Sequence, residues 1–284
     1  MKIIECPRDA MQGLEEFIPT KEKVIYLNQL LQVGFDTLDF GSFVSPKTIP
    51  QMRDTAEVLQ QLDLSKTTTK LLAIVANTRG AKEASRFEMI HYLGFPLSIS
   101  ETFQQRNTNK SIAEALNTVN EIQEICDKTG KTLVTYISMA FGNPYHDPYD
   151  VEQVGKFVDI LSTLDIKIIS LADTIGVSKP SQIQYLLKTL TNQFPQTEFG
   201  AHLHSNPATA TEKINAAYKA GCQRFDGALK GFGGCPMAED ELVGNLATET
   251  ILDYLDSQNS APILNREALK MSIILADSIF PKEA

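Results

Sequence analysis

Two histidines separated by one residue, His202 and His204, form the pair in this sequence best suited to chemistry. The chain has only four histidines, and these two close a short apolar run typical of a β-strand. Side chains two residues apart in a strand point to the same face, so both imidazoles would face one side. Neutral imidazoles near a carboxylate suit a divalent cation such as Mn, Fe, Zn or sometimes Mg. The spacing favours a metal site over the alternative of two rings that only make local hydrogen bonds.

An adjacent pair of opposite charges, Arg8 and Asp9, follows the first apolar run, residues 3–6. Such pairs are most often surface ion pairs in loops. In a catalytic site, Asp9 would instead supply a hard oxygen ligand to a cation, and Arg8 a fixed positive charge for a developing oxyanion. Both interpretations stay open from the pair alone.

A glycine-rich segment, residues 231–236, carries the thiol of Cys235. Its three glycines permit backbone conformations closed to other residues, so we expect a loop able to open and close over a ligand. The thiol would be an acid, base or nucleophile there if its pKa is tuned, and the alternative is a turn with an incidental cysteine. We expect Cys6, Cys126 and Cys222 to be small buried hydrophobes.

Short apolar runs alternate with segments of helical spacing along the whole chain. We predict strands over residues 3–6, 37–40, 71–75, 97–100, 133–138, 166–171, 199–202 and 224–226. We predict helices over residues 21–33, 50–62, 80–91, 111–128, 150–163, 180–193, 207–220, 244–257 and 265–278. The alternation predicts an α/β fold, a (β/α)8 TIM barrel with extra C-terminal helices. A doubly wound open sheet is the rival, and the lack of a GxGxxG motif after any strand disfavours its dinucleotide-binding form.

In such a barrel, the residues at the carboxyl ends of the strands face the substrate. Besides the two pairs above, these ends carry Asp39, Glu101 and Asp173, and Asn245 follows the eighth strand. Asp173 has the alternative role of capping a turn. We expect the barrel to bring these side chains toward one site.

Composition narrows the class of protein. The 284 residues are 43% hydrophobic with a net charge of −9, and no linker interrupts them, so we predict a single catalytic domain over residues 1–284. The acidic balance argues against nucleic acid as a partner, since that needs clustered Lys and Arg. No apolar run approaches the ~20 residues that cross a bilayer, so we expect no membrane partner. A first strand in place of a targeting peptide, and four scattered cysteines, favour a cytoplasmic location.

Several segments together resemble the 3-hydroxy-3-methylglutaryl-CoA (HMG-CoA) lyase family, in order from about residue 3 to 250. They are residues 6–12 (CPRDAMQ), 41–47 (GSFVSPK), 50–52 (PQM), 171–177 (LADTIGV), 202–204 (HLH), 233–236 (GGCP) and 244–249 (GNLATE). The resemblance implies a TIM barrel with one divalent cation, Mg or Mn, and retro-Claisen cleavage of an acyl-CoA to acetoacetate and acetyl-CoA. The implied ligands of the cation are Asp9, His202, His204 and Asn245.

The resemblance also implies roles for other residues. Arg8 would offset charge on the thioester oxygen as an enolate forms, and Cys235 would protonate the enolate carbon. Asp173 or His202 would relay the proton of the substrate hydroxyl, and the choice between them stays open. Asp39 stands where the family has a Glu, one methylene longer, that would reach Arg8 or substrate.

The chain departs from the family at several positions. Ala10 replaces a usual Gly, Ser205 replaces an Asp, and Glu15 stands where a basic residue is common. These changes keep open a lyase for a different 3-hydroxyacyl-CoA, and a barrel that binds acyl-CoA without turnover is the non-enzymatic alternative. A Claisen synthase fits less well, because those chains generally continue well past the barrel. We also expect a homodimer, because two-fold dimers are the commonest soluble oligomers.

Overall fold

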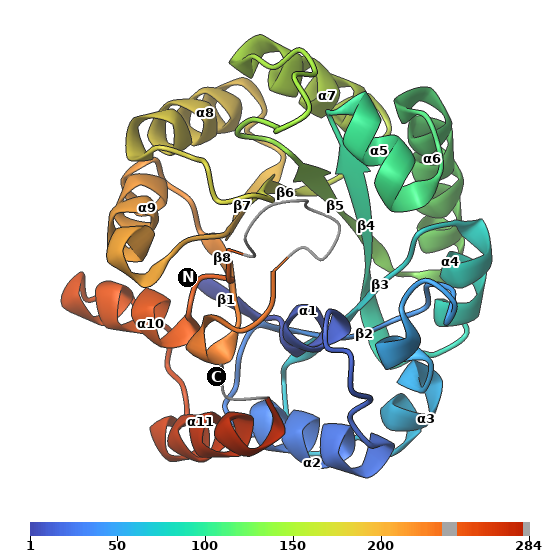
Figure 1. Ribbon diagram of the computed structural model, residues 1–284, viewed down its shortest axis with the longest axis vertical. Helices are drawn as coiled ribbons and strands as arrows, with labels where there is room; N and C mark the ends of the chain where they lie inside the picture. Colours follow the sequence, from blue (N-terminus) through green and yellow to red (C-terminus); the bar gives the residue numbers. More distant parts are fainter. Residues whose placement is uncertain (235–242, 281–284) are drawn as a thin grey trace.

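Eight parallel strands close into a barrel in the computed structural model, which describes residues 1–234 and 243–280 (Figure 1). The strands follow chain order around the barrel, and β8 pairs with β1 to close it. The strands are β1 Lys2–Glu5, β2 Thr37–Ser42, β3 Lys70–Ile74, β4 Ile90–Ser98, β5 Thr132–Ser138, β6 Ile168–Asp173, β7 Glu198–Leu203 and β8 Arg224–Gly227. The predicted barrel is confirmed, and closure excludes the open sheet.

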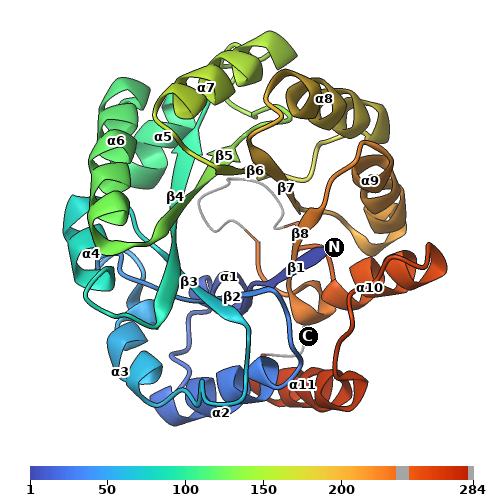
Figure 2. The ribbon, with the colours of Figure 1, turned by 180° about the vertical axis from the view of Figure 1, so that it is seen from behind.

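Helices form a ring outside the strands, with α1 set across the mouth of the barrel (Figures 1 and 2). The helices are α1 Pro7–Gln12, α2 Thr20–Leu31, α3 Thr55–Gln60, α4 Thr78–Ala84, α5 Glu101–Thr108, α6 Ile112–Thr129, α7 Val151–Thr163, α8 Pro180–Gln193, α9 Pro207–Lys219, α10 Thr248–Ser257 and α11 Arg266–Ile279. Two short 3₁₀ helices, η1 Pro50–Met52 and η2 Leu229–Gly231, follow β2 and β8. The last helix, α11, packs against α2. Across the described residues, every helix is too short or too polar to traverse a bilayer.

Helix α6 shows how the sequence sets these elements. Ser111 and Glu114 form a capping box that satisfies backbone N–H groups at the start of the helix. Gly130 ends it in the left-handed conformation, at φ 67°. Between these ends, Val119 and Ile122 belong to an apolar stripe that is fully buried against the barrel. The helix predicted at residues 111–128 is therefore confirmed almost to the residue.

The fourth strand was predicted too short. The prediction placed it at residues 97–100 after a helix over 80–91, whereas α4 ends at Ala84 and β4 runs from Ile90 to Ser98. Gly94 and Pro96 break the apolar run of β4, and such residues ordinarily argue against a strand interior. Gly94 is needed here because a Cβ at that position would lie 2.5 Å from the Cδ1 atom of Ile74 inside the barrel.

Buried Glu5 ties β1 to the segment that follows β8. Its Oε1 accepts a hydrogen bond from the Leu229 backbone N–H at 2.9 Å, and its Oε2 accepts one from the Thr248 hydroxyl at 2.5 Å. Burial raises the pKa of Glu5 from about 4.5 to about 8, although these two hydrogen bonds oppose the rise. The folded protein therefore holds a proton on Glu5 in a pH range where the unfolded chain has lost it.

We expect this proton to make the free energy of unfolding fall as pH rises from about 4.5 to about 8, because the native state binds more protons than the unfolded state there. Glu5→Gln keeps an acceptor for the Leu229 N–H and turns an amide N–H toward the Thr248 hydroxyl, which can accept it, and it should flatten this part of the slope. Chemical denaturation at several pH values measures it. Glu57→Gln, at an exposed position on α3, is the control. A slope in Glu5→Gln as steep as in the wild type would contradict the assignment.

Candidate active site

A cavity of about 450 Å³ opens at the carboxyl ends of the strands, where a barrel carries its site. We call it the mouth cavity. Its lining includes Arg8 and Asp9 from α1 and both predicted histidines, His202 and His204. Apolar side chains supply much of the remaining wall. The predicted convergence of these four residues on one site is therefore seen in the structure.

Arg8 is held by three acceptors and does not form a surface ion pair. Pro7 begins α1 directly after β1, which turns the following residues across the mouth. The Nε atom of Arg8 donates to both Asp39 oxygens at 3.1–3.2 Å, and its Nη1 donates to Asp9 and Gln12, each at 2.8 Å. Only 8% of the Arg8 side chain is exposed. The guanidinium is therefore fixed in place before any ligand arrives.

Asp39 contacts Arg8 directly, through both of its carboxylate oxygens. It is buried and is not among the lining residues of the mouth cavity, so the structure gives no support to the predicted contact with substrate. Burial raises the pKa of Asp39 to about 6, although the charge of Arg8 opposes the rise. Its role in this structure is to position Arg8.

The four residues predicted as cation ligands form one group. Ligand atoms of Asp9, His202 and His204 all lie within 4.8 Å of one another. Asn245 joins them through its Nδ2, which donates to Asp9 Oδ2 at 2.8 Å and to the Phe232 carbonyl at 2.9 Å. Burial alone would raise the pKa of Asp9, but Arg8 and the two imidazoles lower it below its usual value. Asp9 is therefore an ionised oxygen donor beside two imidazoles.

His204 carries the clearest sign of a missing partner. Both of its ring nitrogens are buried and have no hydrogen-bond partner within residues 1–234 and 243–280. Burial lowers the pKa of His204 to about 4, so the ring is neutral and one nitrogen keeps a lone pair. A buried polar group without a partner is costly. A divalent cation beside Asp9 would take the lone pair of one nitrogen and so reduce that cost, and the residues present fit such an ion.

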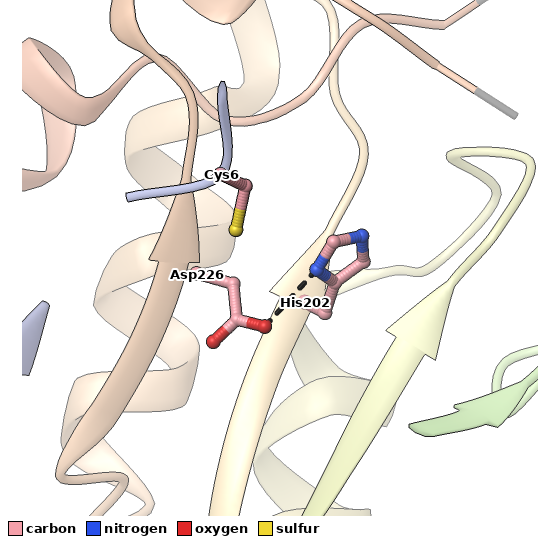
Figure 3. A group of neighbouring side chains, drawn as sticks. All are labelled: Cys6, His202 and Asp226. Carbon is pink, nitrogen blue, oxygen red and sulfur yellow. Dashed lines mark hydrogen bonds and ion pairs between the residues drawn. The ribbon is translucent and has the colours of Figure 1, made fainter. Parts of the chain in front are cut away.

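His202 is oriented by a carboxylate that the sequence did not single out. Its Nδ1 donates to Asp226 Oδ2 at 3.1 Å, and the other ring nitrogen points away from Asp226 (Figure 3). Burial alone would lower the pKa of His202, but this hydrogen bond and the charge of Asp226 raise it. Asp226 ends the predicted strand over residues 224–226, so its place at a carboxyl strand end was a usable signal.

Asp173 is buried but turned away from the mouth cavity, contrary to the prediction. Its Oδ2 accepts from Lys213 Nζ at 2.7 Å, and both oxygens accept from the Ser178 backbone N–H. Its chain neighbours Ala172 and Thr174 line the cavity instead. Successive residues of a strand alternate sides, and Asp173 is on the outward side. Lys213 lies within a predicted helix, and no sequence signal linked it to a carboxylate 40 residues earlier.

Glu101, like Asp173, lies outside the site, although the sequence analysis placed it at the carboxyl end of a strand. It is exposed, lies in the first turn of α5 and accepts a hydrogen bond from the Ile112 backbone N–H at 3.1 Å. It is not among the residues lining the mouth cavity. The early end of β4 explains the difference, because Glu101 belongs to the following helix.

The glycine-rich segment packs against the cation ligands as far as it is described. A Cβ at Gly233, whose φ is +95°, would lie 2.8 Å from the Asp9 carbonyl oxygen and 2.9 Å from the Ala10 Cα. Only glycine fits so close to α1 in this conformation. Cys235 lies outside the described residues.

Comparisons with known proteins point to one family. The HMGL-like family model matches residues 2–273. Hydroxymethylglutaryl-CoA lyase YngG of Bacillus subtilis is 35% identical over 253 residues, which cover 89% of this chain and 84% of that protein. A 3-hydroxy-3-isohexenylglutaryl-CoA/hydroxymethylglutaryl-CoA lyase of Pseudomonas aeruginosa is 31% identical over 90% of this chain and 85% of its own length. An HMG-CoA lyase from Acinetobacter baumannii, solved with coenzyme A and 3-methylmalate, superposes with a TM-score of 0.90 at 28% identity, covering 98% of this chain and 90% of that one.

Proposed function

Because the chain belongs to the HMGL-like family, we propose that it is a carbon–carbon lyase that cleaves HMG-CoA to acetoacetate and acetyl-CoA. The observation that carries the proposal is the group formed by Asp9, His202 and His204 beside a fixed Arg8 in one cavity. Cleavage of the C2–C3 bond requires a deprotonated tertiary hydroxyl and a stabilised enolate, and this group can serve both needs.

We propose Mg or Mn as the cation, because Asp9 and Asn245 offer the oxygen donors that hard cations take, beside two imidazoles. The residues that would hold it are Asp9, His202, His204 and Asn245. When bound, such a cation lowers the pKa of the substrate hydroxyl and orients it. The unpartnered nitrogens of His204 support this assignment.

Arg8 would stabilise the enolate. The thioester oxygen gains negative charge as the C2–C3 bond breaks, and a guanidinium already fixed by Asp39 needs no reorganisation to meet it.

His202 is the better placed of the two candidate proton relays, because it lines the mouth cavity while Asp173 faces Lys213. One ring nitrogen of His202 is bonded to Asp226. The other nitrogen can therefore hold the cation or the hydroxyl proton, but not both at the same time.

The mouth cavity also offers a cation suited to the phosphates of CoA. Arg53 is exposed, lines the cavity and lies 3.4 Å from the centroid of the Phe17 ring. Glu15 lines the same cavity and would oppose those phosphates. The partner we propose is an acyl-CoA, bound with its thioester toward Arg8.

We propose a cytoplasmic location and a homodimer as well. Cys6, Cys126 and Cys222 are free thiols, which suits a reducing compartment. Two apolar side chains three residues apart on α11, Met271 and Ile274, are more than half exposed and offer a surface for a second copy.

Cys235 is proposed, from sequence alone, as the acid that protonates the enolate carbon. We expect Cys235→Ala to bind Mn and acyl-CoA as the wild type does while kcat falls by about 10²–10⁴-fold, the usual contribution of a general acid. Acetoacetate release measures kcat, and equilibrium dialysis measures binding. Cys126→Ala, which changes a cysteine on α6, is the control. Wild-type turnover in Cys235→Ala would remove this thiol from the mechanism.

The test of the proposed function is acetoacetate release from HMG-CoA by EDTA-treated protein, with and without added Mg or Mn. Product that depends on the cation supports the lyase. If folded, cation-loaded protein gives no product from HMG-CoA but cleaves a 3-hydroxyacyl-CoA with a longer branch, the substrate assignment is wrong. Tight acyl-CoA binding with no product from either compound supports the non-catalytic alternative.

A further inference from the structure

A second set of metal-ligating atoms lies behind His202, on the side of its ring that faces Asp226. The Sγ atom of Cys6, a carboxylate oxygen of Asp226 and a ring nitrogen of His202 all lie within 4.8 Å of one another (Figure 3). These residues come from the end of β1, from β8 and from β7, which are neighbours around the barrel. We call them the sulfur cluster.

The sulfur cluster has unused bonding capacity. Asp226 is 2% exposed, and its Oδ1 has no partner in the part of the chain that the structure describes. Cys6 is 1% exposed, and its thiol makes one long contact, 3.6 Å, to the Ile4 carbonyl. A buried carboxylate with an unsatisfied oxygen is costly unless a cation or hydrogen-bond donor meets it. The nearby charge of Arg224 offsets part of this cost, but no group of the described chain donates a hydrogen bond to Oδ1, so Asp226 keeps capacity for a ligand.

From this geometry we propose that Cys6, Asp226 and His202 form a second cation site, selective for zinc over magnesium. One sulfur, one imidazole nitrogen and one carboxylate oxygen are a donor set that zinc takes in proteins. Magnesium takes oxygen donors in octahedral geometry and keeps several waters, so this dry, sulfur-containing cluster suits it poorly. The thiol gives up its proton when it binds the ion.

Zinc in the sulfur cluster excludes the use of His202 in the mouth cavity, because a neutral imidazole has one lone pair for a metal. With Nδ1 donating to Asp226, the lone pair is on the other nitrogen. If zinc takes Nδ1, the proton moves to that other nitrogen, which then cannot hold a cation. Zinc would therefore inhibit by selecting the wrong tautomer, a consequence that rests on the proposed lyase function, whereas zinc binding does not.

An ion can approach from the mouth cavity, because His202 lines it and stands in front of the cluster. The side chain of His202 is 12% exposed and that of Asp226 is fully buried, so the imidazole is the first ligand an incoming ion meets. Rotation of the imidazole is the movement that entry requires.

Cobalt absorption tests binding directly. The full chain carrying Cys235→Ala, reduced and stripped with EDTA, is titrated with Co²⁺, so that Cys235 cannot supply the sulfur. We expect an intense near-ultraviolet sulfur-to-cobalt absorption that saturates near one equivalent and disappears when Zn²⁺ is added. A second substitution in this protein, Cys6→Ser, should abolish the absorption, whereas Cys126→Ala in its place should not. No absorption in the parent protein, or full absorption with Cys6→Ser, would overturn the proposal.

Zinc inhibition tests whether zinc in the sulfur cluster prevents His202 from holding a cation in the mouth cavity. In Mg-supported acetoacetate release, wild type and Cys6→Ser should match without zinc, and Cys6→Ser should need at least about 10-fold more zinc for the same inhibition. Equal inhibition of both proteins would refute the exclusion. Absence of Mg-supported product would count against the proposed function only, because the cobalt titration does not depend on it. If Cys6→Ser fails to fold, as judged by its thermal transition, Cys6→Ala replaces it.

Discussion

Replacing Arg8 with glutamine is expected to lower kcat for acetoacetate release by about 10²–10³-fold, the usual cost of removing one preorganised oxyanion donor. Arg8 lines the mouth cavity with its guanidinium fixed by Asp39, Asp9 and Gln12. The charge it meets develops only as the C2–C3 bond breaks, so KM should change much less than kcat.

The measurement pairs steady-state kinetics with stability, because Arg8→Gln also leaves Asp39 and Asp9 without their buried cation. Breaking such a pair from one side typically costs about 3–5 kcal/mol of stability, so kinetics must be recorded where the variant is folded. Arg8→Lys keeps the charge but loses the two-pronged contact with Asp39, and should recover only part of kcat. Arg79→Gln, at an exposed position on α4 outside the mouth cavity, is the control. A kcat near that of the wild type in Arg8→Gln would contradict the proposed role.

Replacing His204 with alanine is expected to weaken Mn binding by about 100-fold or more and to abolish cation-dependent turnover. Loss of a residue that only supports a metal ligand costs up to about 100-fold in affinity, and loss of a ligand should cost at least as much. The same change should leave the cation-free protein nearly as stable as the wild type. Both ring nitrogens of His204 are without hydrogen-bond partners in the described chain, so alanine breaks no bond there. Asp9→Ala, by contrast, removes contacts with Arg8, Gln12 and Asn245 and should destabilise the cation-free protein as well.

Thermal unfolding with and without Mn separates these effects. The wild type should gain stability as Mn is added, because an ion that binds only the folded state shifts the equilibrium by mass action. His204→Ala should show the wild-type transition without Mn and little gain with it. His146→Asn, an exposed position with φ of 59° that asparagine tolerates, is the control. A full Mn-dependent gain in His204→Ala would exclude His204 as a ligand.

The spacing of residues along the sequence was enough to predict those features of the site that depend only on residues close together in the chain. His202 and His204 share a face because alternate residues of a strand always do, and the structure places their ring centroids 5.4 Å apart. The barrel itself followed from alternating periodicity, which reports local burial along each element. Both predictions needed only a few neighbouring residues.

Longer-range features were beyond the sequence. Alternate residues of a strand face opposite sides, so a shift of one residue decides whether Asp173 faces the cavity. The sequence pattern around Asp173 did not show which residues of the strand face inward. Asp226 and Lys213 act through partners 24 and 40 residues earlier, and only tertiary packing brings those partners together. In β2 the register shifts between Asp39 and Gly41, which no periodicity predicts.

The pairing of β1 with β8 has a consequence for how the chain matures. Until β8 has been synthesised, one edge of β1 has no neighbour, and an open strand edge invites association with other chains. Asp9 follows β1 and Asn245 follows β8, so their hydrogen bond spans 236 positions and forms only when the first and last strands meet. Contacts so distant in sequence form slowly. A cation held by both residues would join the segments that follow the first and last strands of the barrel. In cells short of that cation, more of the newly made protein should therefore stay in an incompletely closed state, which chaperones and proteases recognise.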